Sequence, residues 1–401
     1  MKKLSIFILI MLAAAIFAFA GAVSAPAKAE TDSDGNGETQ TVDQSIDELL
    51  KNLDLSGVQG LLDALDNRAL SVFGFGDIVS RVRAVASGEY SDDFGGIVTY
   101  VLAVLGADVL EFLPMLIGCI AIVLAYNVIN SVKSRFASES TEKVVYFATS
   151  LLAVTLVVGY FSSVTASAVG LVSSLKNQIG ASAPVLITLM TAAGAGGSAS
   201  VYSPAVAVLA SGMTAAVVYL AFPALLMGLV FDVIGSVSTG LKLGKTAEFF
   251  RSACKWVLGT AFFLFIAVIG VSGITASVRD GISVRAARFA VSKYVPVIGG
   301  YLSQGFDFVM AGNVLIKNAV GSSVVVLIVL TAAPVITRIA VFTLTLKLTA
   351  AIAEPLGGDR TCGILTSISK SSSVIAAVVA AVTFLYILFL SMLICTGNIG
   401  L

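Results

Sequence analysis

The sequence predicts an all-α, polytopic membrane helical bundle, preceded by a cleaved signal peptide and a short amphipathic helical region outside the cytoplasm. Three observations lead to this fold class. Hydrophobic residues make up 57% of the chain and charged residues only 12%, whereas about a quarter of the residues of a soluble domain are charged. Several segments contain about 20 apolar residues, the length that crosses a bilayer as a helix. A series of residues in the membrane part also occurs twice in the same order, which predicts a parallel internal repeat of about 111 residues.

Residues 1–29 have the three parts of a secretory signal peptide. Lys2 and Lys3 precede an apolar run over 4–20, and Ala27 and Ala29 form the small-residue cleavage pattern. We expect cleavage after Ala29, which places the mature N-terminus outside the cytoplasm. Because the apolar run is long for a signal peptide, an uncleaved anchor helix is the alternative.

The extracytoplasmic region predicted at 30–94 is acidic, with 14 Asp and Glu residues against 4 Lys and Arg residues. Residues 31–41 are polar and rich in Asp and Gly, which is typical of disorder. Beyond them, apolar residues recur at helical spacing opposite an acidic face and predict amphipathic helices with a break near Gly57. Such helices either dock on a partner protein or pack against the membrane domain of their own chain.

The membrane domain predicted at 95–401 crosses the bilayer six times. The expected crossings are 112–129, 144–163, 204–233, 256–274, 322–348 and 373–395. The third and fifth runs are too long for one straight span, and Pro223 and Pro334 within them predict kinked or broken helices. Two further apolar stretches, 97–109 and 179–193, are too short to span, so we expect interfacial or re-entrant segments there.

The predicted repeat pairs residues whose numbers differ by 110 to 112. Each copy contains one crossing helix, a semi-polar segment and a second, proline-bent helix that crosses back. The two copies are therefore parallel and related by an axis along the membrane normal. The alternative is chance matching of Ala/Val/Ser-rich sequences, although paired prolines at one offset are harder to obtain by chance. The pairs are Lys143 and Lys255, Gly159 and Gly270, Thr165 and Thr275, Pro184 and Pro296, and Pro223 and Pro334.

The distribution of Lys and Arg predicts the orientation, because short cytoplasmic loops are enriched in these residues. With the N-terminus outside, the basic loops at 130–143, 234–255 and 349–372 are cytoplasmic. The segment 275–321 then lies outside although it is also basic. Either the topology differs there, or these charges bind a partner or line a path. The candidate assembly or path residues are Arg279, Arg285, Arg288, Lys293, Lys317 and Asn318.

Two ionisable residues are expected at membrane depth, where a charge is costly and often functional. Arg338 lies within the bent helix that begins near Ser322, and Asp232 lies near the end of the equivalent helix of the first copy. We therefore expect the two side chains to be partners. The alternative is a helix that ends near Ile336 and leaves Arg338 at the membrane interface.

The sequence offers little for catalysis. The chain has no histidine, which excludes Ser-His-Asp and Cys-His catalysis and zinc sites that contain histidine. It has no GxxxxGK[ST] motif for phosphate binding, and its four cysteines are dispersed without a CxxC pair. We expect no enzyme activity, no cofactor and no metal, and an energy source that lies on another protein.

The C-terminal part of the chain carries a series of ordered motifs. They are DGI at 280–282, VPVIG at 295–299, LIKNAVG at 315–321, PLGG at 355–358 and ISK at 368–370, together with Arg285, Arg288, Asp307, Gly397 and Asn398. These motifs resemble the signature of the stage III sporulation protein AE family of endospore-forming bacteria. The remainder of the chain is similar to the family in layout only.

The resemblance implies a permease-like membrane subunit of the channel or secretion-like complex that links mother cell and forespore. Such a subunit lies in the mother-cell membrane around the forespore, with a cytoplasmic ATPase and intermembrane ring proteins as partners, and sustains late forespore gene expression. Pro355, Leu356, Gly357 and Gly358 form a candidate cytoplasmic docking turn for the ATPase, with a plain turn as the alternative. A stand-alone secondary transporter for a small solute is the alternative function. We expect membrane lipid around the chain. We expect no nucleic-acid partner.

Overall fold

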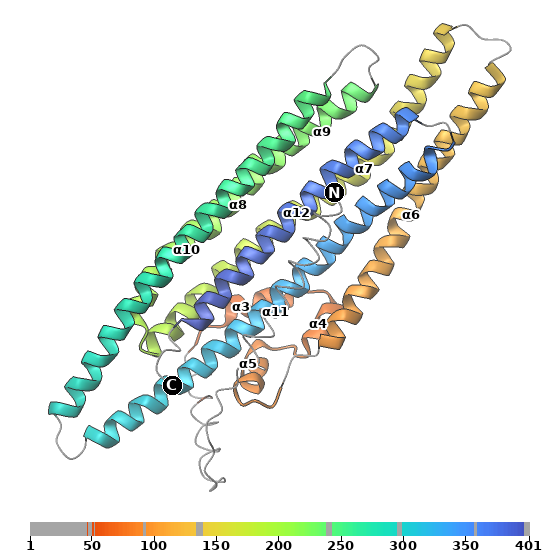
Figure 1. The fold of residues 1–401 in the computed structure, drawn as a ribbon. Coiled ribbons are helices and arrows are strands. Elements are labelled where there is room, and N and C mark those ends of the chain that lie inside the picture. The colour runs from red at the N-terminus through yellow and green to blue at the C-terminus, as the bar shows by residue number, and fades with distance from the viewer. Residues whose placement is uncertain are drawn as a thin grey trace.

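The computed structural model describes residues 46, 50–51, 53–90, 94–133, 139–237, 243–294, 299–356 and 359–396. These residues form helices joined by short turns, with no strand among them, and the long helices lie side by side (Figure 1). The predicted signal peptide and the acidic stretch at 31–41 lie outside the described residues. The all-α fold class is confirmed for the part of the chain that the structure describes.

Six helical segments in the described part of the chain are long and apolar enough to cross a membrane. Each predicted crossing lies within one of them. They alternate in direction and form an up-and-down bundle (Figure 1). The segments are α6 (Phe94–Lys133), α7 (Glu139–Ala192), the series α8 (Gly196–Ala215), η1 (Ala216–Ala221) and α9 (Phe222–Val237), α10 (Gly244–Tyr294), α11 (Gly299–Ala353) and α12 (Asp359–Cys395).

The predicted interfacial or re-entrant segments at 97–109 and 179–193 are wrong. The first belongs to α6, and the second continues α7 to its end at Ala192. With 54 residues, α7 is about 80 Å long at 1.5 Å per residue and extends past a hydrocarbon layer about 30 Å thick. Its last turns are apolar because Ile179, Ala183 and Leu186 are fully buried against other helices, not because they form a separate membrane segment.

The two prolines expected to bend helices have different surroundings. Pro223 lies two residues after the end of the π-helical turn η1, whose cap residue Phe222 donates its N–H to the carbonyl of Val217. The wider turn fits the missing N–H of proline and the bulk of its ring. Pro334 instead lies within α11, which continues without a break to Ala353. A broken helix at Pro334 is therefore wrong, and so is a helix that ends near Ile336.

The internal repeat stays a prediction. Helix α7 with α8–α9, and helix α10 with α11, form hairpins whose helices run in the same order of directions (Figure 1). Of one predicted proline pair, Pro184 lies inside α7, and Pro296 lies outside the described residues.

The short helices α3 (Ser56–Asp63), α4 (Asn67–Phe73) and α5 (Ile78–Ala86) pack against α7, α6 and α11 of their own chain. Their apolar faces are buried, with Val58, Leu62 and Phe73 fully inaccessible. Asp77 caps α5 by accepting the N–H of Ser80, and this hydrogen bond holds the pKa of the Asp77 carboxyl below its usual range. Of the two roles left open for the amphipathic helices, packing on the membrane domain is the one observed.

Helices α11 and α12 occupy the centre of the bundle. In the most apolar stretch of α11 and of α12, 61% of the residues are buried, against 22% in that of α6 and 17% in that of α10. The outer helices expose rows of large apolar side chains, among them Leu102 on α6 and Trp256 and Phe263 on α10. Exposed apolar rows around a buried pair of helices are the arrangement expected of a bundle surrounded by lipid.

Gly321 allows α11 and α12 to approach closely. A Cβ atom at this position would lie 2.3 Å from Cγ1 and 2.6 Å from Cδ1 of Ile394. We expect Gly321→Ala to lower the free energy of unfolding by about 1–3 kcal/mol through overpacking. Thermal unfolding of the purified chain in detergent measures this loss. Adding Ile394→Ala should recover part of it, and Gly259→Ala, whose Cβ meets nothing within 4 Å, is the control. Strictly additive losses in the double variant would contradict the close contact.

Candidate functional site

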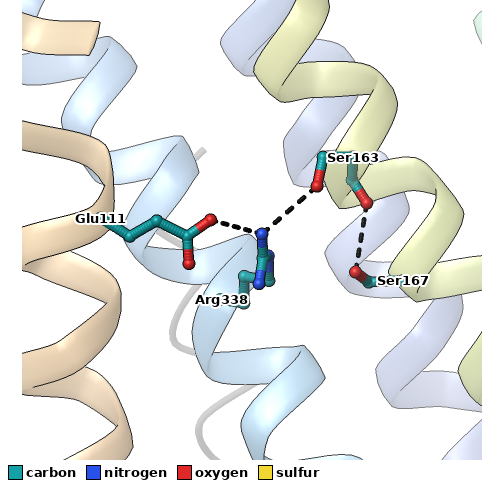
Figure 2. Close-up of polar contacts among 4 residues, drawn as sticks. All are labelled: Glu111, Ser163, Ser167 and Arg338. Atoms are coloured by element: carbon teal, nitrogen blue, oxygen red, sulfur yellow. Dashed lines mark hydrogen bonds and ion pairs between the residues drawn. The ribbon is translucent and has the colours of Figure 1, made fainter. Parts of the chain in front are cut away.

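The most prominent polar arrangement in the bundle surrounds Arg338. Its Nη2 donates to Oε1 of Glu111 at 2.5 Å and to the Ser163 hydroxyl at 3.3 Å (Figure 2). The guanidinium also lies 5.9 Å from the ring centroid of Phe112. One cation from the central helix α11 therefore joins a carboxylate from α6 and a hydroxyl from α7.

Local helix geometry explains how these groups meet. Glu111 lies three residues after Asp108 on α6, so the two carboxylates share one face of the helix. On α7, the Ser167 hydroxyl donates to the backbone carbonyl of Ser163 at 3.1 Å (Figure 2). The Ser163 hydroxyl itself accepts from Arg338. We call Asp108, Glu111 and Arg338 the charge cluster.

The members of the charge cluster differ in burial. The Glu111 side chain is 43% exposed and that of Arg338 is 27% exposed, whereas Asp108 is only 7% exposed. Asp108 lies within electrostatic range of both Arg338 and Glu111. Among the described residues, neither Oδ2 of Asp108 nor Nε of Arg338 has a hydrogen-bond partner. Both are buried atoms, so each lacks the compensation that buried polar atoms normally have.

All three charges lie within candidate membrane spans, Gly95–Ile129 for the two carboxylates and Met310–Ala353 for Arg338. When every group is ionised, two negative charges and one positive charge leave a net charge of −1. An uncompensated charge at membrane depth is costly and typical of a functional position. The arrangement is suited to binding a proton or a polar group, and it holds no nucleophile paired with a base.

The predicted pairing of Arg338 with Asp232 is wrong. Asp232 on α9 forms a buried ion pair with Arg251 on α10, near the charge of Lys370. The close approach of these two helices depends on Gly228, where a Cβ would lie 3.1 Å from the carbonyl oxygen of Ala247. The partner of Asp232 therefore comes from α10, the next helix along the chain.

The true partner of Arg338 was not found from the sequence because the predicted crossing began at 112. Glu111 is the residue immediately before that boundary and was therefore placed outside the membrane. Helix α6 begins at Phe94 and carries Asp108 and Glu111 within the candidate span Gly95–Ile129. Two acidic residues three apart in an apolar stretch were the signal that could have identified them.

The six candidate assembly or path residues lie on two helices, α10 and α11. Arg279, Arg285, Arg288 and Lys293 lie in α10 beyond its candidate span, Gly244–Ser272, and their side chains lie outside the described part of the structure. Lys317 and Asn318 lie further along, in the apolar part of α11.

Lys317 is not a surface residue, and its role in assembly or in lining a path stays a prediction. Its side chain is fully buried and donates to the carbonyl of Thr396, directly after the end of α12. A cation at a helix C-terminus interacts favourably with the helix dipole. Asn318 is half-buried, and its side-chain oxygen has no hydrogen-bond partner among the described residues. Lys317 therefore contributes to the contact between α11 and the end of α12.

The candidate docking turn lies between α11 and α12. Pro355 is exposed and Leu356 is half-buried, whereas Gly357 and Gly358 lie outside the described residues. The turn follows the hydrogen bond from the Glu354 N–H to the Ala350 carbonyl, which ends the helix. A docking role for this turn stays a prediction.

Comparison with known proteins supplies the family. The stage III sporulation protein AE family matches residues 77–397, a range that includes the charge cluster and all six candidate spans. The stage III sporulation protein AE of Bacillus subtilis (strain 168) is 27% identical over 286 residues, which cover 71% of each chain. No solved structure matches the chain. Because the family match covers the whole membrane bundle, the chain belongs to the stage III sporulation protein AE family.

Proposed function

We propose that this chain is a permease-like membrane subunit of a channel or secretion-like complex that links mother cell and forespore. The complex is needed for late forespore gene expression and spore formation, and this subunit lies in the mother-cell membrane around the forespore. The observation that carries the proposal is the family match over residues 77–397, which coincides with a bundle of six candidate membrane spans.

The other subunits of the complex are proposed partners. A cytoplasmic ATPase supplies energy, because the chain has no phosphate-binding loop of its own, and the exposed turn at Pro355 is a candidate docking point. Ring proteins of the intermembrane space bind on the opposite side, at residues 273–294 of α10 and 299–309 of α11. We call these residues the α10–α11 arm, which reaches past the ends of the neighbouring helices (Figure 1).

Two finer features belong to the same proposal. Removal of residues 1–29 as a signal peptide places α3 to α5 outside the cytoplasm, next to the extracytoplasmic ends of α6 and α7. A parallel repeat of about 111 residues relates the two central hairpins. Both features suit a subunit whose outer face meets proteins of the intermembrane space. The chain is proposed to have no enzymatic activity.

A stand-alone secondary transporter for a small solute is the second candidate. The observation that favours it is the charge cluster, which places two carboxylates and a guanidinium inside candidate spans. Ionisable side chains at such positions often mark substrate or ion pathways. The two candidates differ in their partners, since a transporter works alone in a vesicle and a complex subunit does not.

Purification of the intact complex distinguishes the two candidates. An affinity tag on this chain, with mild detergent extraction from sporulating cells, should recover an ATPase and extracytoplasmic ring proteins in fixed ratios to the chain. An unrelated tagged membrane protein from the same cells is the control for carry-over. The proposal fails if the chain purifies without these proteins and the purified chain alone drives solute uptake into vesicles.

A further inference from the structure

We propose that Asp108 is a proton-binding residue of the membrane domain, which takes up and releases a proton beside the Arg338–Glu111 ion pair. The reaction is a simple one, in which the Asp108 carboxylate and a proton from water form the carboxylic acid. The proposal rests on the geometry of this chain and does not depend on the proposed complex.

The first argument is the charge balance. Arg338 binds Glu111 directly at 2.5 Å, so one positive and one negative charge cancel in that pair. Asp108 is the remaining charge, and it is 7% exposed within the candidate span Gly95–Ile129. An isolated carboxylate is strongly disfavoured in an apolar interior and is neutralised by a proton instead. Burial therefore favours the neutral acid of Asp108 over its carboxylate.

The second argument is that two buried polar atoms of the charge cluster lack a hydrogen-bond partner among the described residues. Oδ2 of Asp108 lacks a hydrogen-bond partner, and so does the buried Nε of Arg338. The cluster thus holds an unused acceptor and an unused donor. When Asp108 loses its proton, its carboxylate competes with Glu111 for the guanidinium. Proton release therefore changes how α6 is held against α11.

The third argument is access. The Glu111 side chain is 43% exposed and Arg338 is 27% exposed, so the ion pair opens onto the outside of the bundle. An ion pair that faced hydrocarbon directly would be costly. This opening is better explained by water or by a polar neighbour than by lipid tails. We therefore place the entry of the proton at this exposed pair, which lies within electrostatic range of the buried Asp108 carboxyl.

Among the described residues, the elements around Asp108 add no further charge that acts on it. The charged groups that act on Asp108 are Arg338 on α11 and Glu111 on α6. Helix α7 contributes the hydroxyls of Ser163 and Ser167. Helix α4, which also packs on α6, places Asp66 and Arg68 near Tyr100 instead. A metal cation is disfavoured, because the guanidinium already supplies the positive charge next to both carboxylates.

Infrared difference spectroscopy on the purified full-length chain in lipid discs tests the proposal. As the pH is raised from about 5 to about 9, the wild-type chain should lose the carbonyl band of one protonated carboxyl, although exposed carboxyls ionise below this range. Asp108→Asn should lack this band. Asp108→Glu should retain it at a displaced frequency, and Asp63→Asn, at an exposed and unrelated position, should leave it unchanged.

Three results would overturn the proposal. One is a wild-type chain without a titrating carboxyl band in this range. Another is a band that persists unchanged in Asp108→Asn or, if that variant does not fold, is not displaced in Asp108→Glu. The third is a band that responds to sodium at constant pH and not to pH itself. Because the experiment uses the chain alone, each of these results leaves the proposed complex untouched.

Discussion

Arg338→Gln is expected to lower the amount of folded chain in the membrane severely and to prevent spore formation. The change leaves Glu111 without its partner and removes the only cation near Asp108 among the described residues. The pair is partly exposed, so the loss comes mainly from an unpaired carboxylate inside a candidate span, where a lone charge costs about 3 kcal/mol, against a total stability of about 5–15 kcal/mol for typical domains. The measurements are protein level in membranes, the thermal unfolding midpoint in detergent, and spore counts.

The double variant Arg338→Gln with Glu111→Gln distinguishes loss of the ion pair from loss of packing. It removes both charges of the pair and leaves Asp108, which is proposed to be protonated, so it should be more stable than Arg338→Gln alone. Arg338→Lys keeps the positive charge and should lie between the wild type and Arg338→Gln. If Arg338→Gln accumulates normally and unfolds at the wild-type temperature, the ion pair has no structural importance.

Charge reversal of Arg285 and Arg288 to Glu is expected to leave membrane insertion intact while abolishing assembly with partners and late forespore gene expression. Both residues lie in α10 beyond the candidate span Gly244–Ser272, within the α10–α11 arm. The reversal changes their summed charge from +2 to −2. Electrostatic complementarity sets partner choice and association rate, and juxtaposed like charges cost several kcal/mol. Co-purification and a forespore-specific reporter measure the two effects.

The control for this experiment is Lys176→Glu, a reversal of an exposed residue in the latter half of α7. It should leave assembly and spore formation close to the wild type. The assembly role of the arm is refuted if the reversed chain still co-purifies with its partners and spores form normally. Accessibility labelling that places residue 285 in the cytoplasm would refute it as well.

The sequence by itself determined the membrane class, the six long apolar segments and the family. Each of these depends on local properties, namely the hydrophobicity and length of a segment and the order of short motifs along the chain. The same local rules treated 97–109 and 112–129 as separate segments, although both belong to α6, because apolar residues that pack in a protein core cannot be told from residues that contact lipid. Stretches such as 179–193 were therefore separated from helices that in fact continue through them.

Only the tertiary structure decided which charged side chains meet. Arg338 pairs with Glu111 on α6, Asp232 pairs with Arg251 on α10, and Lys317 is buried against the end of α12. These partners come from different helices, and their contacts depend on how the helices rotate and approach one another. The close approach at Gly228 and Gly321 shows how strongly small residues control this packing. Helix rotation and spacing result from side-chain packing across the whole bundle, so no local pattern in the sequence encodes them.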